Sequence, residues 1–425
     1  MHRNQTRLLF ILSTILFYAC NDHGSQGPIS KDSSSATIHN YAFDREFLRN
    51  HSKNIIELRN ETGKARLLLS GEYQGRVMTS TSNGDSGISY GWINYGLIAS
   101  GEKKKQFNAV GGENRFWMGP EGGQYSIYFK AGDSFNIAHW QVPPIIDTVS
   151  YDLRQDLPTT ATGATGPMQA TFTKTASFSN YSGTRFDIRI DRTISLLSRE
   201  QMESELHTEI PSNVNFVGYV TDNTITNTGT DWKKQSGLLS IWLLSMFTPT
   251  PQTVVVIPFH PQPDARSFIT DDYFGKVPSD RLQVKDSVLY FTCDGKYRSK
   301  IGLSPMIAKP LAASYDFKNN VLTLLIPTID KNGMYVNSKW EIQKEPYSGD
   351  VINSYNDGPL QDGSQLGPFY EVESSSSTKE LKQGEKLEYR EGTCHLQGDY
   401  NTLRSFAKHL LGVDLDEVKA GAVKR

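Results

Sequence analysis

The chain has 425 residues, which by length allows one large domain or several ordinary ones. Its 44 basic and 46 acidic residues give a net charge of −2, and its one basic run, at 103–105, is typical of a solvated loop. Binding of phosphate backbones needs a basic stripe, so this balance argues against a nucleic-acid partner. Aromatic residues make up 11% of the chain, enough to build a large core and also line a polar cleft.

The first residues predict export. Arg3 and Arg7 precede an uncharged run over 8–19, and Cys20 follows this run directly. A membrane-spanning helix needs about 20 apolar residues, so this shorter run suits a signal peptide. The residues just before Cys20 resemble a bacterial lipobox, which implies that Cys20 becomes the lipidated N-terminus. We therefore predict a signal peptide over 1–19 and a lipid-anchored protein of the cell envelope, on its periplasmic or outer-membrane face; the alternative is a buried N-terminal helix with a chance cysteine.

The next segment, 20–37, is rich in Gly, Ser, Asp and Pro and is predicted to be a flexible tether. No comparable linker divides 38–412, so this stretch is predicted to be a single domain, followed by a C-terminal tail over 413–425. Within 41–61, the apolar residues Phe43, Phe47, Leu48, Ile55 and Leu58 are spaced roughly as one face of a helix.

From residue 65 onward the pattern favours short strands separated by turn residues. Residues 71–75 predict the turn of a hairpin between two strands. Residues 185–190 alternate apolar with charged side chains, as a half-buried strand does. We predict an all-β fold, one large antiparallel β-sandwich with one or two short peripheral helices. The predicted strands cover 65–70, 76–79, 124–129, 168–172, 185–190, 215–221, 224–228, 237–247, 253–258, 288–293, 312–316, 321–327 and 387–395.

A second helix is predicted over 399–411, with Leu403, Phe406 and Leu410 on one face and Gly412 at its end. Two cysteines remain besides Cys20. In an oxidising compartment Cys293 and Cys394 could form a disulfide, or they could be separate buried thiols. Their spacing does not suggest a metal site, and we predict no metal.

The segment 111–123 combines glycines with polar and aromatic residues. Asn114, Arg115 and Glu121 provide hydrogen-bonding groups for hydroxyls, and Trp117 provides a flat apolar surface. Sugars need both, because an aromatic ring packs on the C–H face while polar groups fix the hydroxyls. We therefore predict a carbohydrate-binding loop; the alternative is a structural turn in which Arg115 pairs with Glu113 or Glu121.

Other candidates lie further along the chain. His139 and Trp140 stand before a Pro-Pro corner and could form a second wall of the cleft, and His260 is a weaker candidate of the same kind. Near the C-terminus, Glu371 and Glu373 lie two residues apart on a predicted strand. They would share one face, so both carboxylates could point into a cleft.

Three segments together resemble a known family: GGENRFWMGPEGG at 111–123, FYEVESSS at 369–376 and KELKQGEKLEYREGTCHL at 379–396. They are similar to the galactose mutarotase-like supersandwich proteins, and more narrowly to bacterial lipoproteins of undetermined function with that fold. In aldose epimerases an arginine, a binding histidine, an acid histidine and a basic glutamate follow in this order. The resemblance implies these roles for Arg115, His139 and Glu371, while Trp242 stands where the acid histidine is expected.

Mutarotation opens a hemiacetal: a carboxylate removes the anomeric proton while an acid protonates the ring oxygen. Trp242 cannot supply that proton, so it is assigned to the binding surface and His260 is the candidate replacement. His139 and Glu371 are the predicted catalytic pair. We predict a carbohydrate ligand with epimerase-like or glycosidase-like acid–base chemistry and no cofactor. The alternatives are a carbohydrate-binding or structural lipoprotein without catalysis, and a polysaccharide lyase that would use Tyr370 and Asn114.

Overall fold

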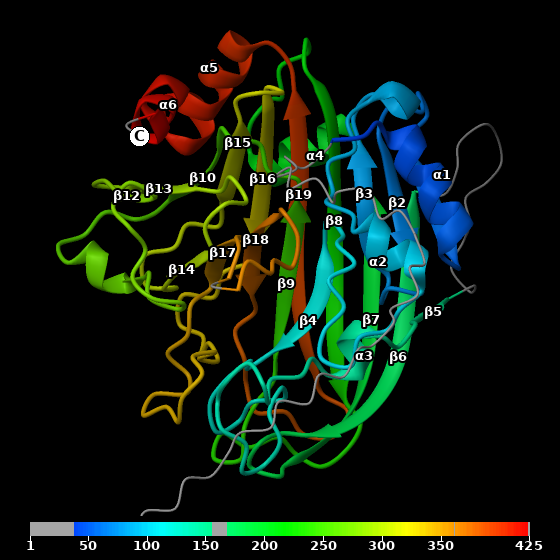
Figure 1. The fold of residues 1–425 in the computed structure, drawn as a ribbon, viewed down its shortest axis with the longest axis vertical. Helices are drawn as coiled ribbons and strands as arrows, with labels where there is room; N and C mark the ends of the chain where they lie inside the picture. Colours follow the sequence, from blue (N-terminus) through cyan, green and yellow to red (C-terminus); the bar gives the residue numbers. More distant parts are fainter. Residues whose placement is uncertain (1–37, 155–167, 361, 424–425) are drawn as a thin grey trace, which may run out of the picture. The chain divides into compact units, whose positions relative to one another are not determined.

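The computed structural model describes residues 38–154, 168–360 and 362–423. In this part of the chain the strands form three sheets, and every pairing between strands is antiparallel (Figure 1). The predicted mostly-β sandwich is therefore confirmed. The predicted signal peptide, the lipidation site Cys20 and the tether lie outside the described residues.

The largest sheet has ten strands, and its long central strands run side by side through the middle of Figure 1. Along β7, Phe186, Ile188 and Ile190 are buried while the charged residues between them face outward, as their alternation predicted. In spatial order the strands are β12 (Leu282–Val284), β13 (Val288–Thr292), β10 (Thr253–Pro258), β15 (Ala312–Asp316), β16 (Val321–Pro327), β19 (Lys386–Gln397), β8 (Asn215–Asn227), β7 (Arg185–Leu196), β6 (Gln169–Ser179) and β5 (Asp152–Leu153).

A six-stranded sheet packs on one face of the ten-stranded sheet. Val255 and Ile257 of β10 join Tyr370 and Val372 of β18 in one apolar cluster, and Ser314 bonds the Tyr370 hydroxyl at 2.8 Å across the interface. The order of its strands is β11 (Ile269–Thr270), β14 (Ser299–Leu303), β17 (Ile352–Asn356), β18 (Tyr370–Ser375), β9 (Ser240–Phe247) and β4 (Arg115–Gly119). Because side chains alternate along a strand, the other face of this sheet is left for the loops.

Helices α4 (Arg199–Leu206), α5 (Tyr400–Leu411) and α6 (Leu415–Val423) cover the opposite face of the ten-stranded sheet. Val254 and Val256, which alternate with the inward residues of β10, share a cluster with Leu403 and Phe406 of α5. The predicted helix over 399–411 is confirmed: the Asp399 side chain caps its N-terminus, and Gly412 ends it in the left-handed conformation. The residues predicted as a C-terminal tail include α6.

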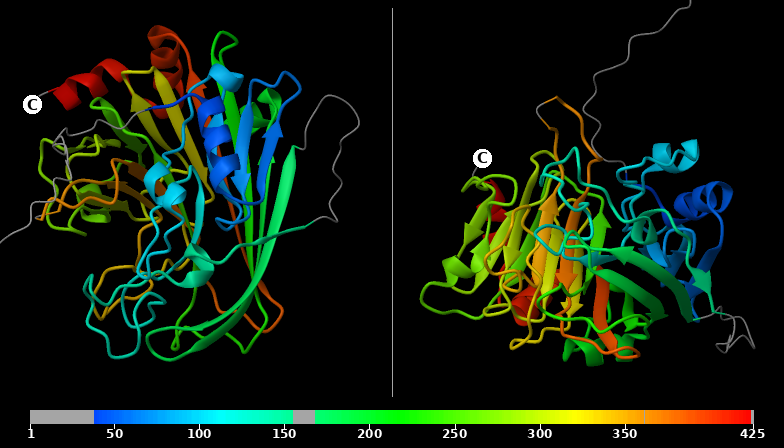
Figure 2. Two further views of the ribbon diagram at one scale, coloured as in Figure 1. Left: turned by 45° about the vertical axis from the view of Figure 1, so that its right-hand side comes forward. Right: turned by 90° about the horizontal axis from the view of Figure 1, so that it is seen from below.

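A three-stranded sheet of β1 (Ile55–Arg59), β2 (Arg66–Ser70) and β3 (Arg76–Thr81) carries α1 (Tyr41–His51) against one side (Figure 2). The helix predicted within 41–61 is real but shorter, because Ile55 and Leu58 lie in β1 instead. The remaining helical elements are α2 (Tyr95–Ser100), α3 (Pro144–Asp147) and the 3-10 turns η1 (Gly84–Ser86) and η2 (Ala265–Phe268).

Two further sequence predictions need correction. Residues 124–129 form turns and bends in place of a strand, and the two strands predicted over 215–228 are the single strand β8. The cysteine question is settled in favour of separate thiols: Cys293 and Cys394 are both free and buried, in different apolar clusters. No helix among the described residues is both long and apolar enough to cross a bilayer.

Candidate functional site

Strand register places the predicted polar residues on the loop-covered face of the six-stranded sheet. Leu244 of β9 lies opposite Arg115 of β4 on one side and opposite Glu373 of β18 on the other. Opposed residues point to the same face, and residues two apart on a strand do as well. Glu371, Glu373, Arg115, Trp117 and Trp242 therefore share this face.

Arg115 and Glu371 form a buried ion pair there. Nη2 of Arg115 donates to Oε1 of Glu371, and the two residues are only 2% and 5% exposed. The guanidinium carbon lies 4.7 Å from the ring centroid of Trp117, a cation–π contact. Burial, together with the nearby Glu373, raises the pKa of Glu371, whereas the positive charge of Arg115 acts in the opposite direction.

Two donor nitrogens of Arg115 make no hydrogen bond within the described part of the chain. Among the described residues, its Nε and Nη1 atoms are buried without a hydrogen-bond partner, and the same holds for Oε1 of Glu373. Buried polar atoms are normally satisfied, because an unmade hydrogen bond costs about 1–3 kcal/mol. Unsatisfied donors and an acceptor that face the same side of one sheet are what a polar ligand would use.

Lys300 of β14 forms the second ion pair of this face. Its Nζ lies 2.8 Å from Oε2 of Glu373 and 4.8 Å from the ring centroid of Trp242. The indole N–H of Trp242 donates to the same Glu373 oxygen at 3.0 Å. Trp242, which stands where the acid histidine was expected, thus serves as a hydrogen-bond donor to a carboxylate.

Glu121 follows β4 in a loop that reaches over the same face. Burial raises its pKa to about 7, while Lys300 and the indoles of Trp140 and Trp340 favour its ionised form. The backbone N–H of Glu121 donates to the Ser338 hydroxyl at 3.2 Å, which joins its loop to the one that carries Trp340. A carboxyl group with a pKa near neutrality is suited to both giving and taking a proton.

Aromatic rings surround this group of charges. Trp117 meets Trp242 edge to face at a centroid distance of 5.5 Å, and Trp140 stacks on Trp340 at 6.0 Å. Tyr128 stacks on the other side of Trp140 at 6.2 Å. We call Arg115, Lys300, Glu121, Glu371 and Glu373, with these rings, the charged face. Within the described residues no group of His, Cys, Asp and Glu side chains is arranged to hold a metal ion.

Asn114 lies elsewhere, although it precedes Arg115 directly. Its side chain is fully buried between the two large sheets, where Nδ2 donates to Glu391 at 2.8 Å and Oδ1 accepts from Nη2 of Arg192 at 2.5 Å. Adjacent residues of an extended chain point to opposite sides, so Asn114 and Arg115 serve different environments. We call Asn114, Arg192, Glu391 and the neighbouring Ser374 and Asn223 the inter-sheet network.

The two candidate histidines also lie outside the charged face as it stands. His139 is exposed in the loop before Trp140, and its Nδ1 lies 3.1 Å from the carbonyl oxygen of Ser134. His260 is exposed after β10, with Nε2 at 3.1 Å from Nζ of Lys331. Neither has a described contact with Arg115 or Glu371.

The structure adds three members that the sequence did not single out, Lys300, Trp340 and Tyr128. Lys300 comes from Ser299–Leu303, a short strand without a strong alternating pattern. The most accessible signal was the pair Glu371 and Glu373, because two buried acids on one strand face need cations from other strands of the same sheet; both cations lie two strands away.

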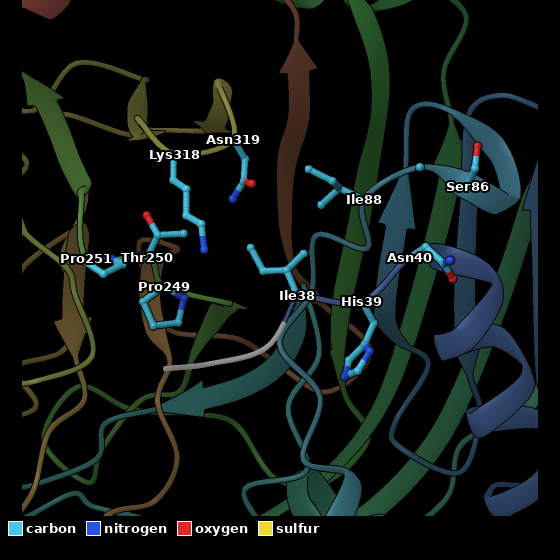
Figure 3. Close-up of a pocket in the computed structure, with 11 residues that line it drawn as sticks. Ile38, His39, Asn40, Ser86, Ile88, Pro249, Thr250, Pro251, Lys318 and Asn319 are labelled. Atoms are coloured by element: carbon cyan, nitrogen blue, oxygen red, sulfur yellow. The ribbon is translucent and has the colours of Figure 1, made fainter. Parts of the chain in front are cut away.

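A separate open hollow of about 450 Å³ lies at another part of the molecule (Figure 3). Pro249, Thr250 and Pro251 form one wall with Lys318 and Asn319, and the facing wall includes Ile38 and Ile88. None of the predicted site residues lines it. The hollow therefore does not bear on the charged face.

The chain belongs to a family of unknown function, DUF6786, which matches residues 39–422. A comparison with curated proteins gave no significant sequence match.

Similar solved structures include the Slr1438 protein of Synechocystis sp. PCC 6803, with 10% identity, TM-score 0.49, and coverage of 81% of this chain and 96% of that one. A galactose mutarotase-like protein of Lactobacillus casei ATCC 334 matches with 11% identity, TM-score 0.47, and coverage of 81% and 100%. A provisionally assigned aldose 1-epimerase of Escherichia coli K12 matches with 11% identity, TM-score 0.45, and coverage of 81% and 98%.

Proposed function

We propose that the charged face binds a carbohydrate and that Glu371 acts there as an acid–base group. The observation that carries the proposal is the buried pair of Arg115 and Glu371 beside Trp117, with two guanidinium nitrogens left unpartnered among the described residues. Free guanidinium donors match the hydroxyl oxygens of a sugar, and indoles match its C–H faces.

The chemistry follows from the acids that the face brings together. Glu371 and Glu121 both have raised pKa values, so one can hold a proton while the other is ionised near neutral pH. Hemiacetal opening and glycosidic cleavage both need such a pair. In this proposal the acid comes from Glu121, since His139 and His260 lie outside the face, and no cofactor takes part.

The test combines binding with turnover. Freshly dissolved α-anomers of a panel of aldoses are followed by NMR with the wild-type protein, Glu371→Gln and the matched surface control Glu388→Gln. Removal of an acid–base group should slow anomer exchange by about 100-fold or more, with saccharide binding retained. Glu388 is exposed on β19, so its variant should match the wild type.

The outcomes separate the alternatives. Saccharide binding, read from tryptophan fluorescence, without any catalysed exchange or hydrolysis would favour a carbohydrate-binding protein without catalysis. If no saccharide changes the fluorescence of Trp117 or Trp242, the carbohydrate proposal fails. Loss of exchange in His139→Gln, with Glu371→Gln unaffected, would return the acid–base role to the histidine.

We also propose that the protein is exported and lipid-anchored through Cys20, from the arginines, the apolar run and the cysteine of its first residues. Mass spectrometry of the mature protein tests this. An acylated peptide that begins at Cys20 is expected, and an unmodified peptide that spans residues 19 and 20 would contradict it.

A further inference from the structure

Lys300 is the cation of the charged face that acts on all three of its carboxylates. Lys300 contacts Glu373 directly at 2.8 Å, and its positive charge also acts on Glu371 and on Glu121. Register explains how one lysine reaches both strand residues: Lys300 lies opposite Tyr355 of β17, and Tyr355 lies opposite Glu371 of β18. Lys300 is thus two strands, about 10 Å of backbone, from the glutamates whose charge it balances.

The surroundings of Lys300 keep its ammonium group in place. Its Nζ lies 4.8 Å from the ring centroid of Trp242 and 5.6 Å from that of Tyr273, and the residue is 9% exposed. The Tyr273 hydroxyl is itself held, since it donates to Asp350 at 2.7 Å. A lysine is seldom buried without a partner, so the rings and Glu373 together fix both its position and its charge.

We propose that Lys300 is the positioning residue of this site, and that its ammonium group, held against Glu373, sets how Glu371 and Glu121 share protons. With Lys300 paired to Glu373, the two outer carboxylates, Glu371 and Glu121, divide one proton. The inference deepens the proposed function, because such a division yields an acid and a base in one site at one pH. The inference rests on the proposed function, but the effect of Lys300 on the titration can be measured without any saccharide.

The charged and titratable groups that face the three carboxylates come from every element around them. Arg115 of β4 pairs with Glu371, Asp357 after β17 raises its pKa, and Asp350 and Tyr273 lie on the side of Lys300. Of these, Arg115 is already paired to a carboxylate, and Asp357 and Asp350 are acids. Lys300 is therefore the cation whose removal changes the proton balance without breaking the pair of Arg115 and Glu371.

The test is a pH titration of the ligand-free, full-length protein. Trp242 contacts both Lys300 and Glu373, so its fluorescence reports on the cluster, and Trp242→Phe gives the background of the other tryptophans. The wild type should titrate near pH 7, where Glu121 has its pKa. In Lys300→Met the midpoint should rise by about one pH unit or more, because a nearby cation lowers carboxyl pKa values by about that amount. Lys300→Arg should restore the wild-type midpoint.

A second variant keeps the test decisive if Lys300→Met does not fold. Glu121 is partly exposed, and Glu121→Gln should remove part of the fluorescence change near pH 7 while the protein stays folded. An unchanged midpoint in Lys300→Met, or an unchanged titration in Glu121→Gln, overturns the inference. A titration that behaves as expected in a protein that binds no saccharide would support the inference and reject the proposed function.

Discussion

Arg115 and Arg192 occupy two environments on either side of the six-stranded sheet, and their difference separates a structural arginine from a candidate functional one. In the inter-sheet network, Arg192 donates through Nε to Gly75, through Nη1 to Asn223 and through Nη2 to Asn114. On the charged face, only Nη2 of Arg115 has a hydrogen-bond partner among the described residues. Both side chains are about equally buried, so burial alone does not distinguish them. The two arginines differ in how many of their guanidinium nitrogens donate a hydrogen bond to the described residues: all three in Arg192 and one in Arg115.

Truncation of the two arginines should have unequal effects on stability, and this is the largest effect we predict. Arg192→Met leaves several buried acceptors unpaired and should lower the free energy of unfolding by about 3–5 kcal/mol. Arg115→Met removes one ion pair, but Glu371 can then take up a proton and become neutral. We therefore expect the free energy of unfolding to fall by only about 1 kcal/mol. Urea unfolding of both variants measures the difference. Equal losses would mean that the charged face is as structural as the inter-sheet network.

Much of the fold could be predicted from the sequence because strand alternation is a local signal. β10, β15 and β16 have the predicted bounds, and α5 was identified by its cap residues and apolar stripe. The same local signal gave a wrong prediction for 124–129. The aromatic residues of this segment suit a strand, yet they form turns that pack around Trp140 and Trp340. Aromatic content indicates burial, and it does not determine backbone conformation.

The site was harder to predict because its members are joined by register across strands. Glu371 and Glu373 could be recognised as a pair since both lie on one strand, and Arg115 since it lies in a distinctive loop. Lys300 could not, because its relation to Glu373 depends on the order β14, β17 and β18 in the sheet. Asn114 was assigned with Arg115 to one loop, whereas the extended backbone sends the two side chains to opposite faces.

The pH dependence of stability should separate the two regions next. Burial raises the pKa of Glu391 from its ordinary value of 4.5 to about 7, so the folded state holds this proton more tightly than the unfolded chain. The folded protein therefore loses stability as the pH rises from about 4.5 to 7, by about 3 kcal/mol for a fully buried group. Glu391→Gln resembles the protonated acid and should flatten the urea unfolding free energy over this range.

Glu121→Gln is the matched variant on the charged face. Burial raises the pKa of Glu121 as well, but its side chain is partly exposed, so solvent reduces the effect on stability and the flattening should be clearly smaller. Equal slopes for the two variants would contradict the comparison. A wild-type protein whose stability rises between pH 5 and 7 would contradict the raised pKa of both groups.

The two buried thiols extend the comparison to both faces of the ten-stranded sheet, because Cys293 lies between the two large sheets and Cys394 lies under the helices. Sγ of Cys293 lies 3.8 Å from the Ser354 hydroxyl, in the apolar cluster between the two large sheets, and Cys394 of β19 lies in the cluster that the helices cover. Burial raises the pKa of Cys394 to about 12 and that of Cys293 further, so both react only when the structure opens. We expect Cys293 to be labelled by Ellman's reagent a few times faster than Cys394, because it is covered by the six-stranded sheet, whose outer face is less completely bonded. Peptide mapping after labelling assigns the sites, and equal rates in urea serve as the control. Earlier labelling of Cys394 would place the weaker region on the helix-covered face of the ten-stranded sheet.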